Sequence, residues 1–260
     1  ASGLPLKTVA SIVFLLLLLL PHPAVAQNLT IQFLNVGQGD AALITTPEGR
    51  HVLIDAGRNP YMVATLLKGV GIDTLDLVVA SHGHADHIGG MVQVLLNTVV
   101  LSYVDNGAPD DSKTFASLKA AVSAEFGGQP PPVRQTDSVG MVTFHVLTAN
   151  PEARTQNEAS VGVLVRYGRF EALFTGDSEE RELAYWLEHD SIPRVEVVKV
   201  AHHGAENGTT DAWTLATRPT LAVVSVGLRN SYRHPSPAAV EMWESADATV
   251  VRTDRLGMIT

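Results

Sequence analysis

The chain has 260 residues, of which 45% are hydrophobic and 17% charged, so it can bury the core of one large domain or two small ones. Its formal net charge is −9, and the sequence shows no basic stripe of the kind by which tight non-specific nucleic-acid binders displace counterions from phosphates. The absence of cysteine excludes a disulfide framework and a lipid-anchored lipoprotein.

The first 26 residues have the features of a secretory signal peptide. Lys7 gives a positively charged start, and the apolar run VASIVFLLLLLL (9–20) leads to a small-x-small cleavage site, AVA, at 24–26. The apolar run is shorter than the ~20 residues that a membrane-spanning helix needs. The sequence therefore predicts export to the periplasm or the extracellular space, with an uncleaved anchor as the alternative. Residues 27–260 contain no apolar run of membrane length.

Short β-branched runs alternate with helical patterns after residue 27. Turn residues and apolar spacing predict these elements in the first half: strands at 29–36, 41–46 and 51–57, a helix from 59–60 to about Lys68, a buried strand at 75–82 and a helix at 88–96. The second half is predicted to contain a strand near 100–104, a helix at about 112–126, a loop at 127–132, strands at 141–149, 160–168 and 169–177, a helix at 178–189, a strand at 195–204, a helix near 210–217, a strand at 220–227, a helix at 236–245 and a strand at 249–253.

The arrangement of these elements predicts one domain over residues 27–260. No linker or low-complexity tract divides this segment. Strand-rich halves that are each followed by helices favour two packed sheets with helices outside. Residues 257–260 are predicted to begin a further strand, which would continue past Thr260.

Metal-competent side chains stand where predicted strands end. A lone histidine is more often a core or surface residue than a ligand, and this interpretation holds for His22, His51, His145 and His189. Histidines and carboxylates that cluster at strand ends are better interpreted as ligands, because such side chains meet at one edge of a layered sheet. The strand-end residues are Asp55, His82, Asp177, His202 and His203.

The stretch SHGHADHIGG (81–90) holds four potential ligands within six positions. His82 and His84 can point at one cation, while Asp86 and His87 turn toward a second position a few ångströms away. Imidazole and carboxylate ligands suit Zn²⁺, with Mn²⁺ or Fe as alternatives.

Two further residues would complete such a centre. Asp177 could bridge the two ions, and either His202 or His203 would complete the second site. Two ions ~3.5–4 Å apart can deprotonate a water between them and stabilise the attacking and leaving oxygens. The spacing therefore predicts a two-metal hydrolytic centre that uses a metal-bound hydroxide.

HGHADH resembles the HxHxDH signature of the metallo-β-lactamase fold superfamily, and other motifs resemble its competence-type branch. That branch contains the extracytoplasmic hydrolase domain of ComEC/Rec2-like DNA-uptake proteins and its secreted relatives. The resemblance covers nearly all of residues 29–260. Its motifs are FLNVGQGDAALI (33–44), LIDAG (53–57), SHGHADHIGG (81–90), the NEAS-to-FTGD hairpin (157–177), VAHHGAENGT (200–209), SVGLRNSYRHPSP (225–237) and VVRTDRLGMI (250–259).

This resemblance implies an α/β fold, a four-layer αββα sandwich, with a dinuclear site. The implied ligands are His82, His84, Asp86, His87, Asp177 and one of the paired histidines. His203 is preferred over His202, because other branches place this ligand directly before a turn of Gly and small residues. Asp55 is expected to orient a ligating side chain.

The sequence departs from many members of the superfamily between its first ligand cluster and Asp177. They have a further histidine there, whereas ARTQNEASVGVLV (153–165) has none. One ion would then be held by two histidines, Asp177 and water. This coordination favours a labile or harder metal such as Mn²⁺ over a zinc ion whose ligands all come from the protein. Asn157 and Ser160 could instead line the substrate pocket.

Two more segments are candidates for substrate binding. Gln38 and Asp40 lie in the glycine turn GQGD, whose backbone N–H groups could form an anion-binding nest, although a plain hairpin turn has the same pattern. Tyr232 and His234 lie in a loop after a strand on the side of the site. His234 could contact a metal-bound phosphate or protonate a leaving oxygen; the alternative is a surface histidine before Pro235.

These features predict an exported metal-dependent hydrolase, specifically a phosphodiesterase or nuclease-type phosphoesterase, with Asp86 and His234 as catalytic residues. Its substrate would be nucleic acid or a cell-wall phosphodiester, and the acidic surface favours short or small phosphoesters. The cofactors would be two divalent ions, Zn²⁺ or Mn²⁺. The alternatives are a β-lactam or lactone hydrolase and a non-catalytic metal-binding exported domain. The sequence identifies no specific protein partner.

Overall fold

The computed structural model describes residues 28–128 and 135–260. The predicted signal peptide (1–26) and most of the predicted loop at 127–132 lie outside the described residues. Among the helices of the described part, none combines the length and apolarity needed to cross a membrane.

The first half forms a five-stranded sheet in the order β1-β2-β3-β5-β7. Its first three strands are antiparallel, and β3, β5 and β7 run parallel. The strands are β1 (Thr30–Phe33), β2 (Ala42–Thr45), β3 (His51–Ile54), β5 (Leu77–Val79) and β7 (Tyr103–Val104), and a separate pair is β4 (Thr74–Leu75) with β6 (Val99–Val100). The helices are α2 (Met62–Gly69), α3 (Ala85–Ile88), α4 (Met91–Asn97) and α5 (Lys113–Glu125).

The second half forms a seven-stranded sheet in the order β14-β13-β12-β11-β10-β9-β8. Strands β8 to β11 are antiparallel, and β11 to β14 are parallel. The strands are β8 (Thr136–Val139), β9 (Val142–Val146), β10 (Val163–Tyr167), β11 (Phe170–Phe174), β12 (Val197–Lys199), β13 (Leu221–Val224) and β14 (Thr249–Arg252). The helices are α6 (Glu180–His189), α7 (Asp211–Thr217), α8 (Pro237–Ser245) and the short α9 (Thr253–Leu256).

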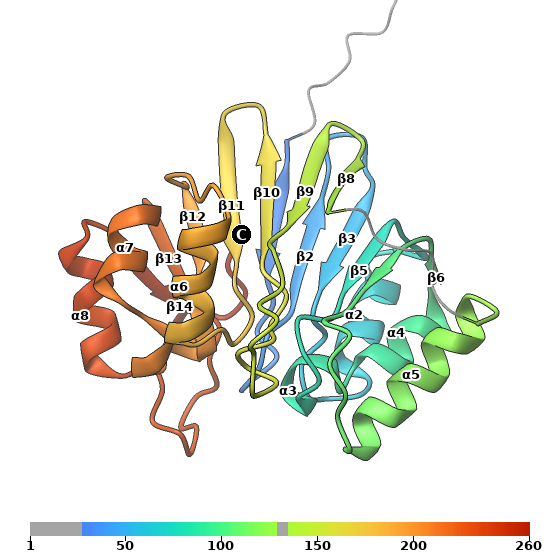
Figure 1. Cartoon of the computed structure of the whole chain (residues 1–260). Helices are drawn as coiled ribbons and strands as arrows, with labels where there is room; N and C mark the ends of the chain where they lie inside the picture. Colours follow the sequence, from blue (N-terminus) through green and yellow to red (C-terminus); the bar gives the residue numbers. More distant parts are fainter. Residues whose placement is uncertain (1–27, 129–134) are drawn as a thin grey trace, which may run out of the picture.

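Three apolar clusters hold four layers together. Because side chains alternate along a strand, Val163 and Val165 of β10 face the other sheet, whereas Leu164 packs toward Trp186 of α6. A third cluster joins the first sheet to helices, with Leu67 of α2 among its members. Figure 1 shows the two sheets in the centre, α2, α4 and α5 on one flank, and α6, α7 and α8 on the other. The predicted αββα sandwich is confirmed.

The parallel strands of both sheets end at a common edge. Residues that follow β3 and β5 in one sheet therefore meet residues that follow β11, β12 and β13 in the other, as the carboxyl ends of parallel strands do in open sheets. The position of the site follows from this topology.

Several predicted elements differ from the observed ones. The helix predicted at 88–96 corresponds to α4, which begins only at Met91, and the preceding residues 85–88 form the short, unpredicted α3. The two helices are separated at Gly89 and Gly90, where a neighbouring loop approaches closely. A Cβ at Gly89 would lie 2.4 Å from the carbonyl oxygen of Arg58. The strand predicted at 195–204 ends at Lys199, and β8 was not predicted at all.

The chain terminus also differs from the prediction. Residues 257–260 form no strand in the described structure, and Ile259 makes only an isolated antiparallel bridge with Phe33. The two residues exchange backbone hydrogen bonds of 2.8 and 3.0 Å.

Candidate metal centre

A first group of ligand atoms lies in the turn after β5. His82 is 1% exposed, and its Nε2 lies 3.0 Å from Nδ1 of His84. The same His82 Nε2 is 3.8 Å from Oδ2 of Asp177, which follows β11 in the other sheet. Ligand atoms of these three residues all lie within 4.8 Å of one another. This spacing would allow all three to coordinate one cation.

A second group lies beside the first and shares Asp177. Oδ2 of Asp177 is 3.2 Å from Nε2 of His87 and 3.4 Å from Nε2 of His203. Asp86 faces this group, because its Oδ2 is 3.6 Å from the same His203 atom. A shared carboxylate between two ligand groups is the arrangement expected of a bridging residue.

The paired histidines His202 and His203 have different surroundings in the structure. Both have positive φ, 49° for His202 and 53° for His203, in the tight turn after β12. His203 is buried and turns into the second group, whereas His202 Nε2 lies 3.3 Å from the Asn157 amide and its Nδ1 3.2 Å from Asn207 Oδ1. The geometry favours His203 as the ligand and leaves His202 on the pocket wall. Non-glycine residues in this backbone region cluster at functional sites.

The ligand histidines are oriented from behind by Asp55 and its neighbours. Asp55, itself at φ 58°, accepts hydrogen bonds from the Ser81 backbone N–H (2.8 Å) and hydroxyl (2.7 Å) and lies 2.8 Å from His87 Nδ1. His203 Nδ1 lies 2.9 Å from the backbone oxygen of Ser225. Fixing the Nδ1 atoms in this way directs both Nε2 atoms toward the site. The expected orienting role of Asp55 agrees with these contacts.

A buried ion pair lies beneath the second group. Lys199, 3% exposed, ends β12; its Nζ contacts Asp40, donates to the Gly176 carbonyl at 2.8 Å and is 3.7 Å from Asp177 Oδ1. Asp40 also lies 3.3 Å from Nδ1 of His203, on the side away from its Nε2. Asp40 also has a ligand atom within 4.8 Å of those of His87, Asp177 and His203, but its pairing with the Lys199 ammonium favours a supporting role over coordination of a cation.

The electrostatics of the site favour a bound cation. Burial opposes ionisation of Asp177, but His203 and His87 hold its pKa well below the ordinary value. Burial would also lower the pKa of His87, yet Asp177, Asp55 and Asp40 raise it to about 10. His87 therefore holds a proton when no metal is bound, and cation binding there would release it.

Unpartnered atoms test whether these residues fit a metal. Among the described residues, the buried Nε2 atoms of His87 and His203 and Oδ1 of Asp177 have no hydrogen-bond partner. Buried polar atoms in proteins almost always have partners, so orphaned donors that converge on one point indicate a missing one. Imidazole and carboxylate are ligands of zinc and manganese. The donor set fits divalent metal ions.

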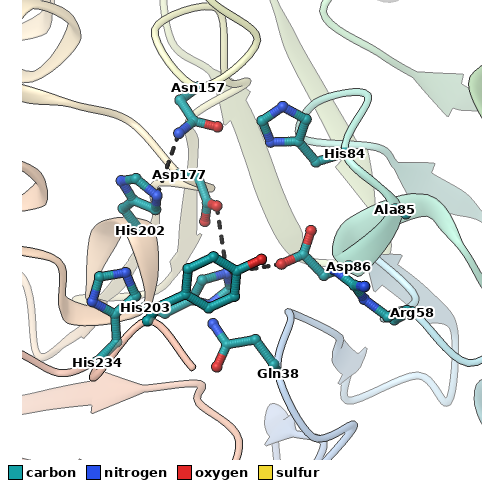
Figure 2. Close-up of a pocket in the computed structure, with 11 residues that line it drawn as sticks. Gln38, Arg58, His84, Ala85, Asp86, Asn157, Asp177, His202, His203 and His234 are labelled. Carbon is teal, nitrogen blue, oxygen red and sulfur yellow. Dashed lines mark hydrogen bonds and ion pairs between the residues drawn. The ribbon is translucent and has the colours of Figure 1, made fainter. Parts of the chain in front are cut away.

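A pocket of about 320 Å³ opens over this centre. Figure 2 shows His84, Asp86 and Arg58 on one side and His202 and His234 on the other, with Asp177 between them. Burial, followed by the nearby His202 and His203, lowers the pKa of His234. The pocket lining is Gln38, Arg58, His84, Ala85, Asp86, Asn157, Asp177, His202, His203, Tyr232 and His234.

The predicted substrate-binding residues fall into two sets. Gln38, Asn157, Tyr232 and His234 line the pocket. Asp40 and Ser160, in contrast to the prediction, are buried beneath it.

Their contacts explain this difference. Ser160 Oγ accepts the backbone N–H of Asp177 at 3.1 Å, and the Asp40 carboxylate is paired with Lys199. The predicted anion-binding nest also loses donors, because the Asp40 N–H is bonded to the backbone oxygen of Asp86 at 3.1 Å.

Three residues of the centre were absent from the sequence prediction. Arg58 lines the pocket, Lys199 lies beneath it, and Ser81 touches two ligand histidines, with its Oγ 3.1 Å from His82 Nδ1 and 3.2 Å from His87 Nδ1. A lone lysine at the end of an apolar strand could have indicated Lys199. No local pattern indicates Arg58, because its position depends on tertiary packing.

Comparison with known proteins agrees with this geometry. Residues 34–227 match the family model of the metallo-beta-lactamase superfamily. The chain belongs to the metallo-β-lactamase superfamily. The fold of this superfamily implies a metal-dependent hydrolase, and the structure contains two groups of candidate metal ligands.

Curated relatives of this superfamily member include competence proteins. The chain is 26% identical over 266 residues to ComE operon protein 3 of Bacillus subtilis, which covers 93% of this chain and 34% of the relative. It is 25% identical to Recombination protein 2 of Haemophilus influenzae, which covers 88% of this chain and 28% of the relative. The chain thus spans about a third of the length of these relatives.

Solved structures of the same fold are more distant in sequence. CmlA beta-hydroxylase (E377D mutant) superposes with a TM-score of 0.57 at 15% identity and covers 96% of this chain and 59% of its own. Igni18, a metallo hydrolase from Ignicoccus hospitalis, gives 0.56 at 16% identity and covers 88% of this chain and 98% of its own. These likenesses establish the fold alone.

Proposed function

We propose that this metallo-β-lactamase superfamily member is a metal-dependent phosphodiesterase with a dinuclear centre. The observation that carries the proposal is the pair of neighbouring ligand groups that share Asp177 at the floor of an open pocket. His82 and His84 belong to the first group, and His87 and His203 to the second.

Two divalent cations at these positions would supply Lewis acidity and activate a water nucleophile. The chain's own residues bind and orient. Asp177 places both groups at a fixed separation, and Asp86 and His203 close the side of the second. His234 donates a hydrogen bond toward the phosphoryl or leaving oxygen from the opposite wall, while Arg58 attracts the anionic ester.

A phosphodiester suits the pocket better than a lactam or a lactone. The region between the first ligands and Asp177 contributes the amide of Asn157 instead of an imidazole, so the first group has only two histidines. Harder, oxygen-preferring metals such as Mn²⁺ suit such a site. Arg58, which forms no ion pair within the described part of the chain, lines the pocket and favours an anionic substrate over a neutral amide or lactone. The competence-protein relatives support nucleic acid or a related phosphodiester as substrate.

We also propose that the chain acts outside the cytoplasm, after cleavage of residues 1–26. The charged start, the apolar run and the small-x-small site support this proposal. Amino-terminal sequencing of the protein recovered from the periplasm or medium of an expressing cell should start at Gln27. Recovery of the intact amino terminus with the membrane fraction would favour the uncleaved anchor.

The decisive experiment measures hydrolysis of bis(p-nitrophenyl) phosphate by the whole chain. The protein is stripped with a chelator and reloaded with Mn²⁺ or Zn²⁺, and His84→Ala, which loses one ligand of the first group, serves as the control. We expect activity that requires metal and falls at least about 100-fold in the control, since metal ions commonly supply several kcal/mol of transition-state stabilisation. A β-lactam and a lactone are assayed beside it.

Each result decides between functions. Turnover of the lactam or lactone without the diester would replace the phosphodiesterase by a hydrolase of that class. Folded, metal-loaded protein that turns over none of the three would leave a metal-binding exported domain.

A further inference from the structure

Three neighbouring rings, two of them stacked, line the pocket. The rings of Tyr232 and His234 are nearly parallel, with an interplanar angle of 10° and centroids 5.8 Å apart. His234 in turn lies 5.6 Å from the ring of His202, which the Asn157 amide contacts. Tyr232 is 58% exposed, so part of its ring remains open to a ligand. An exposed aromatic ring held beside a reaction centre is a ready stacking surface.

The loop that carries Tyr232 is held in shape. The Asn230 side chain bridges it by donating to the backbone oxygens of Gly227 (3.0 Å) and His234 (2.8 Å) and accepting the His234 N–H (3.0 Å). These three bonds span the turn on both sides of Tyr232. The ring is therefore presented by an ordered loop, which reduces the entropy lost when a ligand stacks on it.

Exposed arginines lie in the pocket lining and in the loop that carries Tyr232. Within the described part of the chain, the arginines that form ion pairs are Arg50, Arg166, Arg181 and Arg252. Arg58, Arg229 and Arg233 are exposed and are not among them. Arg58 lines the pocket, and the other two flank Tyr232 in the loop. An acidic protein thus places unneutralised positive charge beside its pocket.

We propose that Tyr232 and Arg58 form a nucleotide subsite, in which Tyr232 stacks on a base next to the scissile phosphodiester and Arg58 contacts a backbone phosphate. The inference rests on the proposed phosphodiesterase function and narrows its substrate to single-stranded nucleic acid. Proteins that bind single strands combine positive charge along the backbone with aromatic rings under the bases. Both elements occur here, in the lining of one pocket.

The same observations disfavour a choline phosphodiester. A quaternary ammonium group is recognised by a cage of aromatic faces in a site that tolerates positive charge. Among the described residues, the pocket lining offers a single tyrosine and no other phenyl or indole ring, and the exposed guanidinium of Arg58 would repel the cation. A neutral base carries no such penalty.

The test compares three esters that share a p-nitrophenol leaving group: thymidine 5′-(p-nitrophenyl phosphate), methyl p-nitrophenyl phosphate and p-nitrophenyl phosphorylcholine. We expect the parent to prefer the thymidine ester, and Tyr232→Ala to reduce the kcat/KM ratio of the thymidine to the methyl ester roughly 10- to 100-fold. Tyr232→Phe keeps the ring and should keep the ratio. Tyr61→Ala is the matched control, because Tyr61 is equally exposed (63%) but lies outside the pocket.

A binding measurement separates the subsite from the chemistry. In the His84→Ala background, fluorescein-labelled decathymidylate should bind, and Tyr232→Ala and Arg58→Gln should each weaken binding at least about fivefold, as expected from loss of a stacked base or a phosphate contact. Arg255→Gln, an exposed arginine outside the pocket, is the control for charge.

The outcomes distinguish the two proposals. A parent that cleaves diesters but shows unchanged ratios and unchanged binding in the variants overturns the subsite and leaves the phosphodiesterase standing. A preference for the choline ester that is lost in Tyr232→Ala overturns it in favour of a choline site. Absence of diester cleavage with Tyr232-dependent oligonucleotide binding would overturn only the phosphodiesterase.

Discussion

Lys199 neutralises the carboxylates beneath the metal centre. Its ammonium group is buried with Asp40 and lies 3.7 Å from Asp177, and both carboxylates raise its pKa against the effect of burial. A buried ion pair adds little net stability, but removing one partner leaves the other as an uncompensated buried charge. The residue therefore matters to stability as well as to the site.

We predict that Lys199→Met, which keeps the length of the side chain, lowers the free energy of unfolding of the metal-free protein by about 3–5 kcal/mol. Lys119→Met is the matched control: Lys119 pairs with Asp105 at 3.1 Å, but its side chain is 42% exposed, so the loss should stay below about 1 kcal/mol. Urea denaturation of the three proteins measures both. Equal losses in the two variants would show that the buried pair has no special role.

At the level of single residues, the sequence indicated the candidate metal ligands better than the residues that orient those ligands or line the pocket. His82, Asp177 and His203 follow apolar strands, and such a change from apolar to ligating residues is visible in the sequence. Ser81 bonds to Asp55, 26 residues earlier in the chain, and Arg58 lines a pocket that is built largely from distant segments. A single sequence contains no sign of these tertiary relationships.

Among the elements, the turn after β1 packs against α3. Gly39 has φ 133°, and a Cβ there would lie 2.1 Å from the backbone oxygen of Asp86.

We predict that Gly39→Ala displaces α3 and lowers the free energy of unfolding by more than about 2 kcal/mol, since backbone strain and a backbone clash add. Gly37→Ala is the control. Gly37 has φ 77° but no atom within 4 Å of its Cβ position, so only left-handed strain of about 1–2 kcal/mol applies. Urea denaturation of the two variants measures both losses in the free energy of unfolding. Equal losses in Gly39→Ala and Gly37→Ala would contradict the prediction.

Helix α6 contains a buried acidic residue outside the site. Glu182 is 1% exposed, and neither carboxylate oxygen has a hydrogen-bond partner among the described residues. Burial, and then the charges of Glu158 and Asp190, raise its pKa to about 8, although Asn150 opposes the shift. The folded pKa exceeds the unfolded value of 4.5, so the folded protein holds the proton more tightly. Its stabilising contribution is complete below pH 4.5 and is lost as the pH rises toward 8.

We predict that Glu182→Gln, which resembles the protonated form, matches the parent at pH 4.5 and exceeds its free energy of unfolding by about 1–2 kcal/mol at pH 8. Glu188→Gln, an exposed position of the same helix, should change stability by less than about 0.5 kcal/mol at either pH. Chemical denaturation across this pH range measures both differences. A Glu182→Gln advantage that is the same at both pH values would exclude a titrating carboxyl as its cause.

The elements themselves were predictable where one periodicity dominates. The buried runs that became β3, β5, β11 and β13 were found, because apolar β-branched residues indicate strands directly. Strand β8 (TDSV) has only one buried residue and lacked that signal. The late start of α4, after the break at Gly89 and Gly90, accompanies the close approach of the Arg58 backbone, a tertiary contact that propensity does not encode.

At the scale of the whole molecule, the centre joins the two halves of the chain. His82, His84 and His87 come from the first half, whereas Asp177 and His203 come from the second. A ligand that binds only the folded state stabilises it by mass action, by about 2.7 kcal/mol per site at a concentration 100 times Kd. Metal binding should therefore stabilise both sheets together.

We predict that Asp177→Asn abolishes nearly the whole metal-induced increase in unfolding free energy, because Asp177 belongs to both ligand groups, whereas His84→Ala removes about half. Elemental analysis should find two ions per parent chain, one in His84→Ala and fewer than one in Asp177→Asn. Asp76→Asn, which alters a carboxylate bonded to Arg50 far from the centre, should keep the full increase. If Asp177→Asn and His84→Ala each lost a single ion, the two groups would be independent sites and Asp177 would not bridge them.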